Sequence, residues 1–109
     1  MRRRVLIAVL AGAALISAVP AQGAPKKTVT LGDNYYMPHA LKVKKGTKVT
    51  WRWSGDETHN VAVTKGPVKF RSAFKSSGSY SKTVKRAGTY TIVCTIHQPD
   101  MKMKLRVTR

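Results

Sequence analysis

The sequence predicts an all-β domain, a Greek-key sandwich of two sheets with about seven to eight strands. Polar and apolar residues alternate with a period of two over short runs, most strictly over residues 48–53, where Val49, Trp51 and Trp53 share one face. This alternation is typical of a half-buried antiparallel strand. Turn-forming Gly, Asp, Asn and Ser separate the runs at short intervals, as in a sandwich. The length suffices for one compact domain and not for two.

The expected strands follow one another along the chain. The first covers residues 27–31, is rich in Thr and Val, and ends at Gly32-Asp33-Asn34, after which residues 35–38 form an irregular aromatic turn. Further strands are expected at residues 41–44, 48–53, 59–64, 80–84, 89–94 and 103–107. Residues 66–78 are consistent with either a strand or a short helical turn.

The amino-terminal residues have the layout of a secretory signal peptide. Three arginines in residues 1–4 precede an apolar run at residues 5–19, and small residues follow at 20–24. The apolar run is shorter than the roughly 20 residues that span a bilayer, which favours a cleaved leader over a membrane anchor. We therefore expect a signal peptide at residues 1–23, cleaved after Ala21 or Gly23, and a periplasmic or extracellular domain at residues 24–109.

The chain is strongly basic. Because only three of its 21 Lys and Arg residues precede residue 24, the mature part carries 18 basic residues against four acids, a formal charge of +14. Such a charge predicts salt-sensitive association with acidic redox proteins, anionic lipid headgroups or anionic cell-envelope polymers. Specific nucleic-acid binding is not expected, because the protein is exported and its charges are spread along strands rather than gathered in an arm or a recognition helix. We expect a monomer.

One cysteine, two histidines and a methionine form the chemically informative pattern. Cys94 is the only cysteine of an exported chain, so it has no intramolecular disulfide partner. His97 and Met101 follow it closely, and His59 lies 35 positions upstream. A thiolate, two imidazoles and a thioether are the ligands of a type 1 (blue) copper centre, in which a weak axial Met completes a His₂Cys site. His39 is expected to be exposed and to play no part in this set.

In these and other motifs the mature chain resembles the cupredoxins, specifically those of the plastocyanin and amicyanin type. The motifs cover most of the chain, and their order, spacing and local residues agree together. They are Met37-Pro38, Leu41-Lys-Val-Lys-Lys-Gly46, Thr47-Lys-Val-Thr-Trp51, Thr58-His-Asn-Val61, Ser79-Tyr-Ser81, Ala87-Gly-Thr-Tyr90 and Cys94-Thr-Ile-His97.

The resemblance implies a cupredoxin-like sandwich and a role for each site residue. His59, Cys94 and His97 would bind one copper ion equatorially, with Met101 as the axial ligand. Asn60 would tie the two ligand-bearing loops together by hydrogen bonding. His97 would be the ligand nearest the surface and the exit for the electron.

The ligand loop departs from the family pattern in one respect. Family loops usually place two or four residues between the second His and the Met, whereas three residues, 98–100, separate His97 from Met101. Met101 is the expected axial ligand because this choice keeps residues 102–107 in register as the final strand. Met103, two residues further on, is the alternative.

These observations predict a carrier of single electrons between redox partners, rather than an enzyme. A copper storage or delivery protein is the first alternative, and a metal-free basic interaction module, with Cys94 in an intermolecular disulfide, is the second. Three histidines in the whole chain are too few for a multicopper oxidase, and no expected cleavage leaves a histidine at the mature amino terminus, as a copper oxygenase would need.

Overall fold

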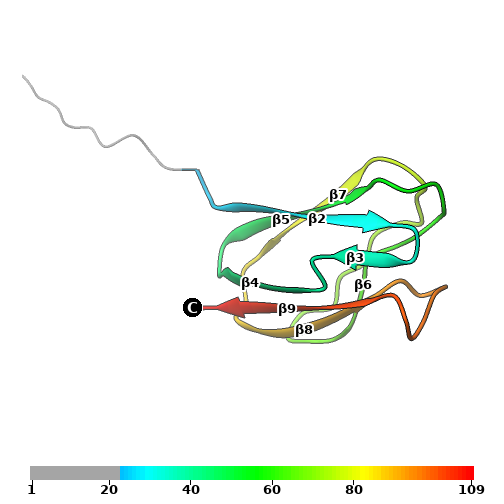
Figure 1. Ribbon diagram of the computed structural model, residues 1–109. Helices are drawn as coiled ribbons and strands as arrows, with labels where there is room; N and C mark the ends of the chain where they lie inside the picture. The colour runs from blue at the N-terminus through cyan, green and yellow to red at the C-terminus, as the bar shows by residue number, and fades with distance from the viewer. Residues whose placement is uncertain (1–22) are drawn as a thin grey trace, which may run out of the picture.

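The computed structural model of the protein describes residues 23–109, which form eight β-strands in two four-stranded sheets (Figure 1). The strands are β2 (Lys26–Gly32), β3 (Tyr35–Met37), β4 (Ala40–Lys44), β5 (Thr47–Trp53), β6 (Ala62–Lys65), β7 (Ser79–Val84), β8 (Gly88–Val93) and β9 (Lys102–Thr108). The predicted signal peptide lies outside these residues, apart from Gly23, and stays a prediction. Within the described range, no helix is long and apolar enough to cross a membrane.

The chain switches repeatedly between the two sheets. One sheet has the strand order β3-β2-β5-β7, and the other has the order β4-β9-β8-β6. The pairs β2–β5 and β4–β9 are parallel, and the remaining four pairs are antiparallel. This connectivity confirms the predicted all-β sandwich with crossing connections between its sheets.

Alternating side chains from both sheets fill the space between them. Along β5 the burial alternates strictly, with Val49, Trp51 and Trp53 turned inward and Lys48 and Arg52 exposed. The opposite sheet contributes its own inward residues, namely Tyr90 and Ile92 of β8 and Met103, Leu105 and Val107 of β9. Burial of one face per sheet supplies the main free energy of folding, and the predicted placement of both tryptophans in the core is confirmed.

Three details differ from the sequence-based expectations. Residues 35–37 form the short strand β3 rather than an irregular turn, because they pair with β2 and bury the side chain of Tyr36. Two strand pairs are parallel, since alternation reports which face is buried and not the direction of the neighbouring strand. The strand expected from His59 begins only at Ala62, and His59 instead pairs as an isolated bridge with Lys75.

The segment between β6 and β7 has no regular strand, yet it covers one side of the core. Phe70 lies in this segment, with its ring centroid 5.9 Å from that of Trp51 and 6.0 Å from that of Tyr90. Further along, Lys75 exchanges two backbone hydrogen bonds with His59, of 2.9 and 3.0 Å. An irregular segment thus holds the backbone of a candidate ligand in place.

Candidate metal centre

The predicted ligand residues meet at one end of the sandwich, where β8 ends and β9 begins. Cys94 directly follows β8, Met101 directly precedes β9, and the loop between them is closed by three backbone hydrogen bonds. Cys94 N–H donates to the Met101 carbonyl (3.1 Å), His97 N–H donates to the Cys94 carbonyl (3.1 Å), and Met101 N–H donates to the His97 carbonyl (3.0 Å). The loop is therefore a compact turn whose shape the backbone determines.

Three donor atoms from two separate parts of the chain converge in this turn. Cys94 Sγ lies 3.4 Å from His97 Nδ1 and 3.9 Å from His59 Nδ1, and the two Nδ1 atoms are 3.3 Å apart. For a metal ion with bonds of about 2.0–2.3 Å to N and S, a trigonal arrangement places the donors about 3.5–3.8 Å apart. The spacing of the three donors thus fits one ion bound between them.

Burial is uneven across the three residues. His59 and Cys94 are fully buried, whereas the His97 side chain keeps 27% of its surface exposed. The buried side chains of Cys94 and His59 exclude water from one side of the site, and the exposed imidazole of His97 connects the other side to the surface. Exposed Ile96 adjoins His97 in the loop. His39 is exposed and does not belong to the cluster, as expected.

Met101 and Met103, the two candidate axial ligands, make different contacts. Met103 lies within β9 opposite Ile92, and its Sδ accepts a hydrogen bond from Trp51 Nε1 at 3.4 Å. Met101 is fully buried at the end of the ligand loop, bonded through its backbone to Cys94 and His97. Residues 102–108 form the last strand, so the register argument that favours Met101 agrees with the fold.

Asn60 connects the two ligand-bearing segments. Its Oδ1 accepts hydrogen bonds from Thr95 N–H (2.8 Å) and Thr95 Oγ1 (3.3 Å), across 35 positions of sequence. Its backbone carbonyl accepts from the Tyr36 hydroxyl at 2.7 Å, and the neighbouring His59 carbonyl accepts from Trp53 Nε1 at 3.2 Å. Side chains from β3 and β5 therefore fix the backbone at His59 and Asn60.

Two carboxylates that the sequence analysis missed lie behind the imidazoles. Asp33 Oδ1 is 3.6 Å from His59 Nε2, and Glu57 Oε1 is 3.7 Å from His97 Nε2. Both distances exceed a good hydrogen bond, and within residues 23–109 His59 Nε2 has no hydrogen-bond partner. A carboxylate behind the outward nitrogen of a ligand histidine orients the ring and fixes its tautomer, so that the other nitrogen faces the metal.

Asp33 is itself held by the loop before His59. Its Oδ1 accepts from the backbone N–H groups of Glu57 and Asp56, both at 2.9 Å. These bonds favour the ionised carboxylate, with the bond from Glu57 contributing most, and they lower the pKa of Asp33 below its usual value. Sequence proximity to His59 could have drawn attention to Glu57. No sequence signal indicates Asp33, which lies in a turn 26 positions upstream of His59.

Comparison with known proteins agrees with this geometry. Residues 24–108 match the family of copper binding proteins described as the plastocyanin/azurin family, and the chain belongs to that family. A plastocyanin from Prochlorothrix hollandica is 31% identical over 104 residues, covering 85% of this chain and 79% of the relative.

Solved structures of amicyanin are similar in fold. A reduced amicyanin mutant is 32% identical, with a TM-score of 0.66 over 81% of this chain and 85% of that chain. The Cu(I) form of another amicyanin mutant is 34% identical, with the same TM-score and coverage. The protein is thus a cupredoxin with copper as its cofactor, and His59, Cys94 and His97 lie together as its candidate site.

Proposed function

We propose that the protein is an exported type 1 copper protein that carries single electrons between redox partner proteins. The observation that supports this most directly is the convergence of Cys94 Sγ and two imidazole Nδ1 atoms on one enclosed point, with a single imidazole edge exposed. Copper bound there would supply the Cu(II)/Cu(I) couple, and no substrate would be converted.

In this proposal each residue has a defined role. His59, Cys94 and His97 are the equatorial ligands, Cys94 binding as the thiolate. Met101 is the axial ligand, supported by its burial in the loop and by the engagement of the Met103 sulfur with Trp51. His97 passes the electron to and from the partner, since it is the most exposed of the three.

The contribution of the chain to electron transfer is rigidity. Backbone hydrogen bonds close the ligand loop, and side-chain bonds from Tyr36, Trp53 and Asn60 hold the His59 segment against it. A trigonal site with a long axial bond suits both oxidation states of copper. A scaffold that keeps the donors in place therefore keeps the rearrangement on electron transfer small.

The choice of partner depends on the surroundings of His97 as well as on the net charge. The net charge favours acidic proteins, but Glu57 lies directly beside the exposed edge of His97 and Asp100 lies in the same loop. We propose that a productive partner presents an apolar or cationic patch to His97, and that acidic proteins associate with other faces of the molecule. The salt dependence of electron exchange with partners of either charge tests this point.

The decisive experiment is the visible absorption spectrum of the mature protein before and after one equivalent of Cu(II). We expect an intense blue thiolate-to-copper band that a reductant bleaches reversibly. A colourless or faintly coloured protein would reject Cys94 as a ligand and bring forward the interaction-module alternative. A blue protein with slow electron self-exchange and ready transfer of copper to a chelator would instead be a delivery protein.

Export is a separate part of the proposal and rests on the sequence of residues 1–23. Edman sequencing of protein recovered from the periplasm or the medium of a producing cell should begin at residue 22 or 24. Retention of the full chain in a membrane fraction would contradict cleavage.

A further inference from the structure

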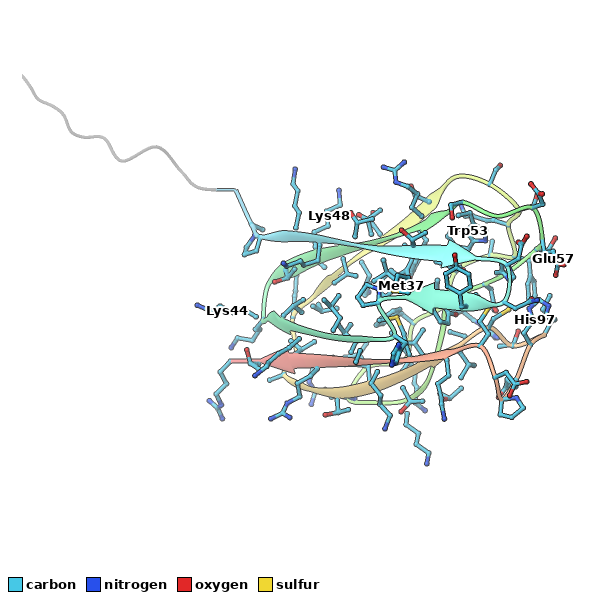
Figure 2. All side chains as sticks on the ribbon, in the orientation of Figure 1. Met37, Lys44, Lys48, Trp53, Glu57 and His97 are labelled. Atoms are coloured by element: carbon cyan, nitrogen blue, oxygen red, sulfur yellow. The ribbon has the colours of Figure 1, made fainter. Side chains whose placement is uncertain are left out.

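The acidic side chains of this protein lie at one end of the molecule. All four acidic residues belong to the copper end: Asp33 and Glu57 face the two histidines, Asp56 bonds to Asp33 through its backbone, and Asp100 lies in the ligand loop. Figure 2 shows Glu57 and His97 together at one end of the molecule and Lys44 and Lys48 toward the other.

The opposite end, here called the basic pole, carries seven exposed cations. Register brings them together from distant positions, because β2 starts beside β5 at the pair Lys26–Lys48, and the Lys45 N–H donates to the Thr108 carbonyl next to the chain end. Gly46 N–H donates to the Val84 carbonyl, so the turn between β4 and β5 lies next to the end of β7. The basic pole comprises Lys26, Lys44, Lys45, Lys48, Lys85, Arg86 and Arg109.

No carboxylate side chain balances these cations. Within residues 23–109 neither Lys nor Arg lies within ion-pair distance of an acidic side chain, and the two carboxylate pairs that exist involve the ligand histidines. The cations of the pole repel one another, and binding of an external polyanion relieves this repulsion.

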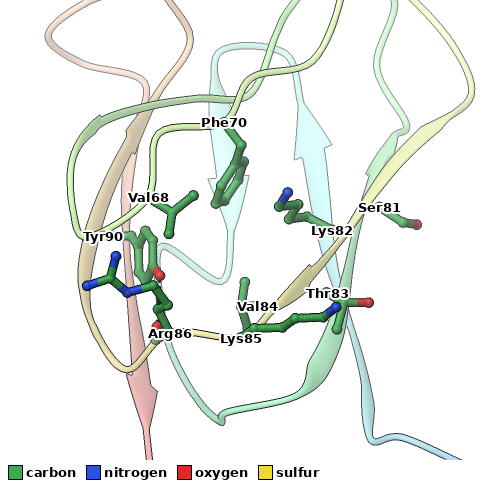
Figure 3. Close-up of a pocket in the computed structure, with 9 residues that line it drawn as sticks. All are labelled: Val68, Phe70, Ser81, Lys82, Thr83, Val84, Lys85, Arg86 and Tyr90. Atoms are coloured by element: carbon green, nitrogen blue, oxygen red, sulfur yellow. Dashed lines mark hydrogen bonds between the residues drawn. The ribbon is translucent and has the colours of Figure 1, made fainter.

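A hollow of about 450 Å³ opens beside the pole (Figure 3). Its apolar wall includes Phe70, Val84 and Tyr90, and its cations are Lys82, Lys85 and Arg86, of which the last two also belong to the pole. Lys82 Nζ lies 5.7 Å from the centre of the Phe70 ring. An apolar wall next to cations matches an anionic amphiphile, in which a phosphate is attached to a hydrocarbon chain.

We propose that the basic pole docks on an anionic lipid bilayer and that the copper end then faces away from the membrane. The hollow favours lipid over other polyanions, because its apolar wall lies next to Lys85 and Arg86 of the pole. Clusters of four to eight Lys and Arg bind anionic lipid surfaces.

This orientation leaves the electron-transfer end free. The seven residues of β9 lead from the ligand loop to the pole, and at about 3.3 Å per residue they separate the two ends by about 20 Å. A protein held by the pole would therefore keep His97 accessible to partners. Vesicle binding needs no copper, so its failure is distinguishable from failure of the proposed electron-carrier function.

The test is sedimentation of the mature protein with phosphatidylcholine vesicles that contain either no anionic lipid or about 30% phosphatidylglycerol, enough to give the surface a negative potential. The pole variant replaces two exposed lysines, Lys45→Gln with Lys85→Gln. The matched control, Lys69→Gln with Lys104→Gln, removes the same charge at exposed positions outside the pole. Each cation at the lipid surface contributes about 5-fold in affinity, so the pole variant should bind anionic vesicles about 30-fold more weakly.

The control should lose several-fold less affinity than the pole variant, and all proteins should leave neutral vesicles unbound. Equal losses in both variants would mean that net charge alone drives binding, which overturns the proposal. The proposal also fails if wild-type protein ignores anionic vesicles, or if it binds duplex DNA or an acidic protein through the pole lysines but not lipid. Circular dichroism of each variant checks that the fold is intact.

Discussion

Asn60→Ala tests whether the copper site is held by the network behind the ligands rather than by the ligands alone. Asn60 is buried and binds no metal in the proposed site, but its Oδ1 accepts two hydrogen bonds from Thr95, next to Cys94. Alanine removes both bonds and leaves the partly buried Thr95 N–H without an acceptor. The backbone carbonyl that accepts from Tyr36 is unchanged.

The expected loss of stability follows from these contacts. The 2.8 Å bond to the backbone N–H contributes about 1.5 kcal/mol and the 3.3 Å bond to the hydroxyl about 0.5 kcal/mol, a total of about 2 kcal/mol. Asn60 Nδ2 has no partner in the described part of the chain, so its removal adds no further cost. With a urea dependence of about 1–2 kcal/mol per molar, the copper-free midpoint should fall by about 1–2 M.

Copper binding should weaken as well, because the His59 and Cys94 segments are then free to shift relative to each other. Loss of a residue that orients ligands typically costs about 10–100-fold in metal affinity. Urea unfolding followed by fluorescence, with and without copper, and competition with a Cu(I) chelator measure the two effects. Thr95→Val is the matched control, since it loses only the 3.3 Å bond and should cost about 0.5 kcal/mol. Unchanged copper affinity and an unchanged blue band in Asn60→Ala would refute the reasoning.

Four further substitutions test the site. Cys94→Ser should abolish the blue band, because the thiolate is its source, while the all-β circular dichroism spectrum remains; a blue Ser variant would exclude Cys94 as a ligand. Met101→Leu should shift the reduction potential measured by voltammetry while copper is retained. Met103→Leu should leave the potential unchanged and lower stability by about 1–3 kcal/mol, because the buried Trp51 Nε1–H loses its acceptor. The reverse result would make Met103 the axial ligand. Gly55→Ala should lower stability by about 1–3 kcal/mol in thermal unfolding, because a Cβ there would overlap the carboxylate of Asp33. Wild-type stability in this variant would show that the loop adjusts freely.

The sequence predicted the parts of this molecule that depend on local pattern. Strict alternation located β5 and the buried face that carries Trp51, because a strand with one buried face imposes a period of two on its own residues. The spacing of Cys94 and His97 likewise located the ligand loop. No comparable sequence pattern indicates the parallel pairing of β2 with β5, because packing across the whole domain determines which strands are neighbours.

The same limit explains which site residues were missed. Asn60 was identified through the family resemblance, which carries information about contacts that a single sequence does not. Asp33 was not identified, because its role depends on the turn after β2 approaching the loop that follows β5. Nothing in the residues around Asp33 distinguishes it from an ordinary turn aspartate. Sequence patterns thus indicated the candidate ligands, whereas residues that approach these ligands from another loop could be found only in the fold.

The acidic residues and the basic pole affect different properties of the protein. The acidic residues act on the reduction potential of the proposed copper centre, and the basic pole acts on association with other surfaces. Asp33 and Glu57 lie within about 4 Å of the imidazoles of His59 and His97, the proposed copper ligands, and negative charge at that range would stabilise Cu(II) over Cu(I). The two side chains are 39% and 55% exposed, so water weakens this effect without removing it. The basic pole lies about 20 Å away, beyond the screening length of about 8 Å at physiological salt. The two carboxylates therefore act on the proposed copper site at much closer range than the basic pole does. The pole acts instead on association, because its cations bind together to one anionic surface. Substitutions can therefore change the reduction potential and the docking of this protein independently.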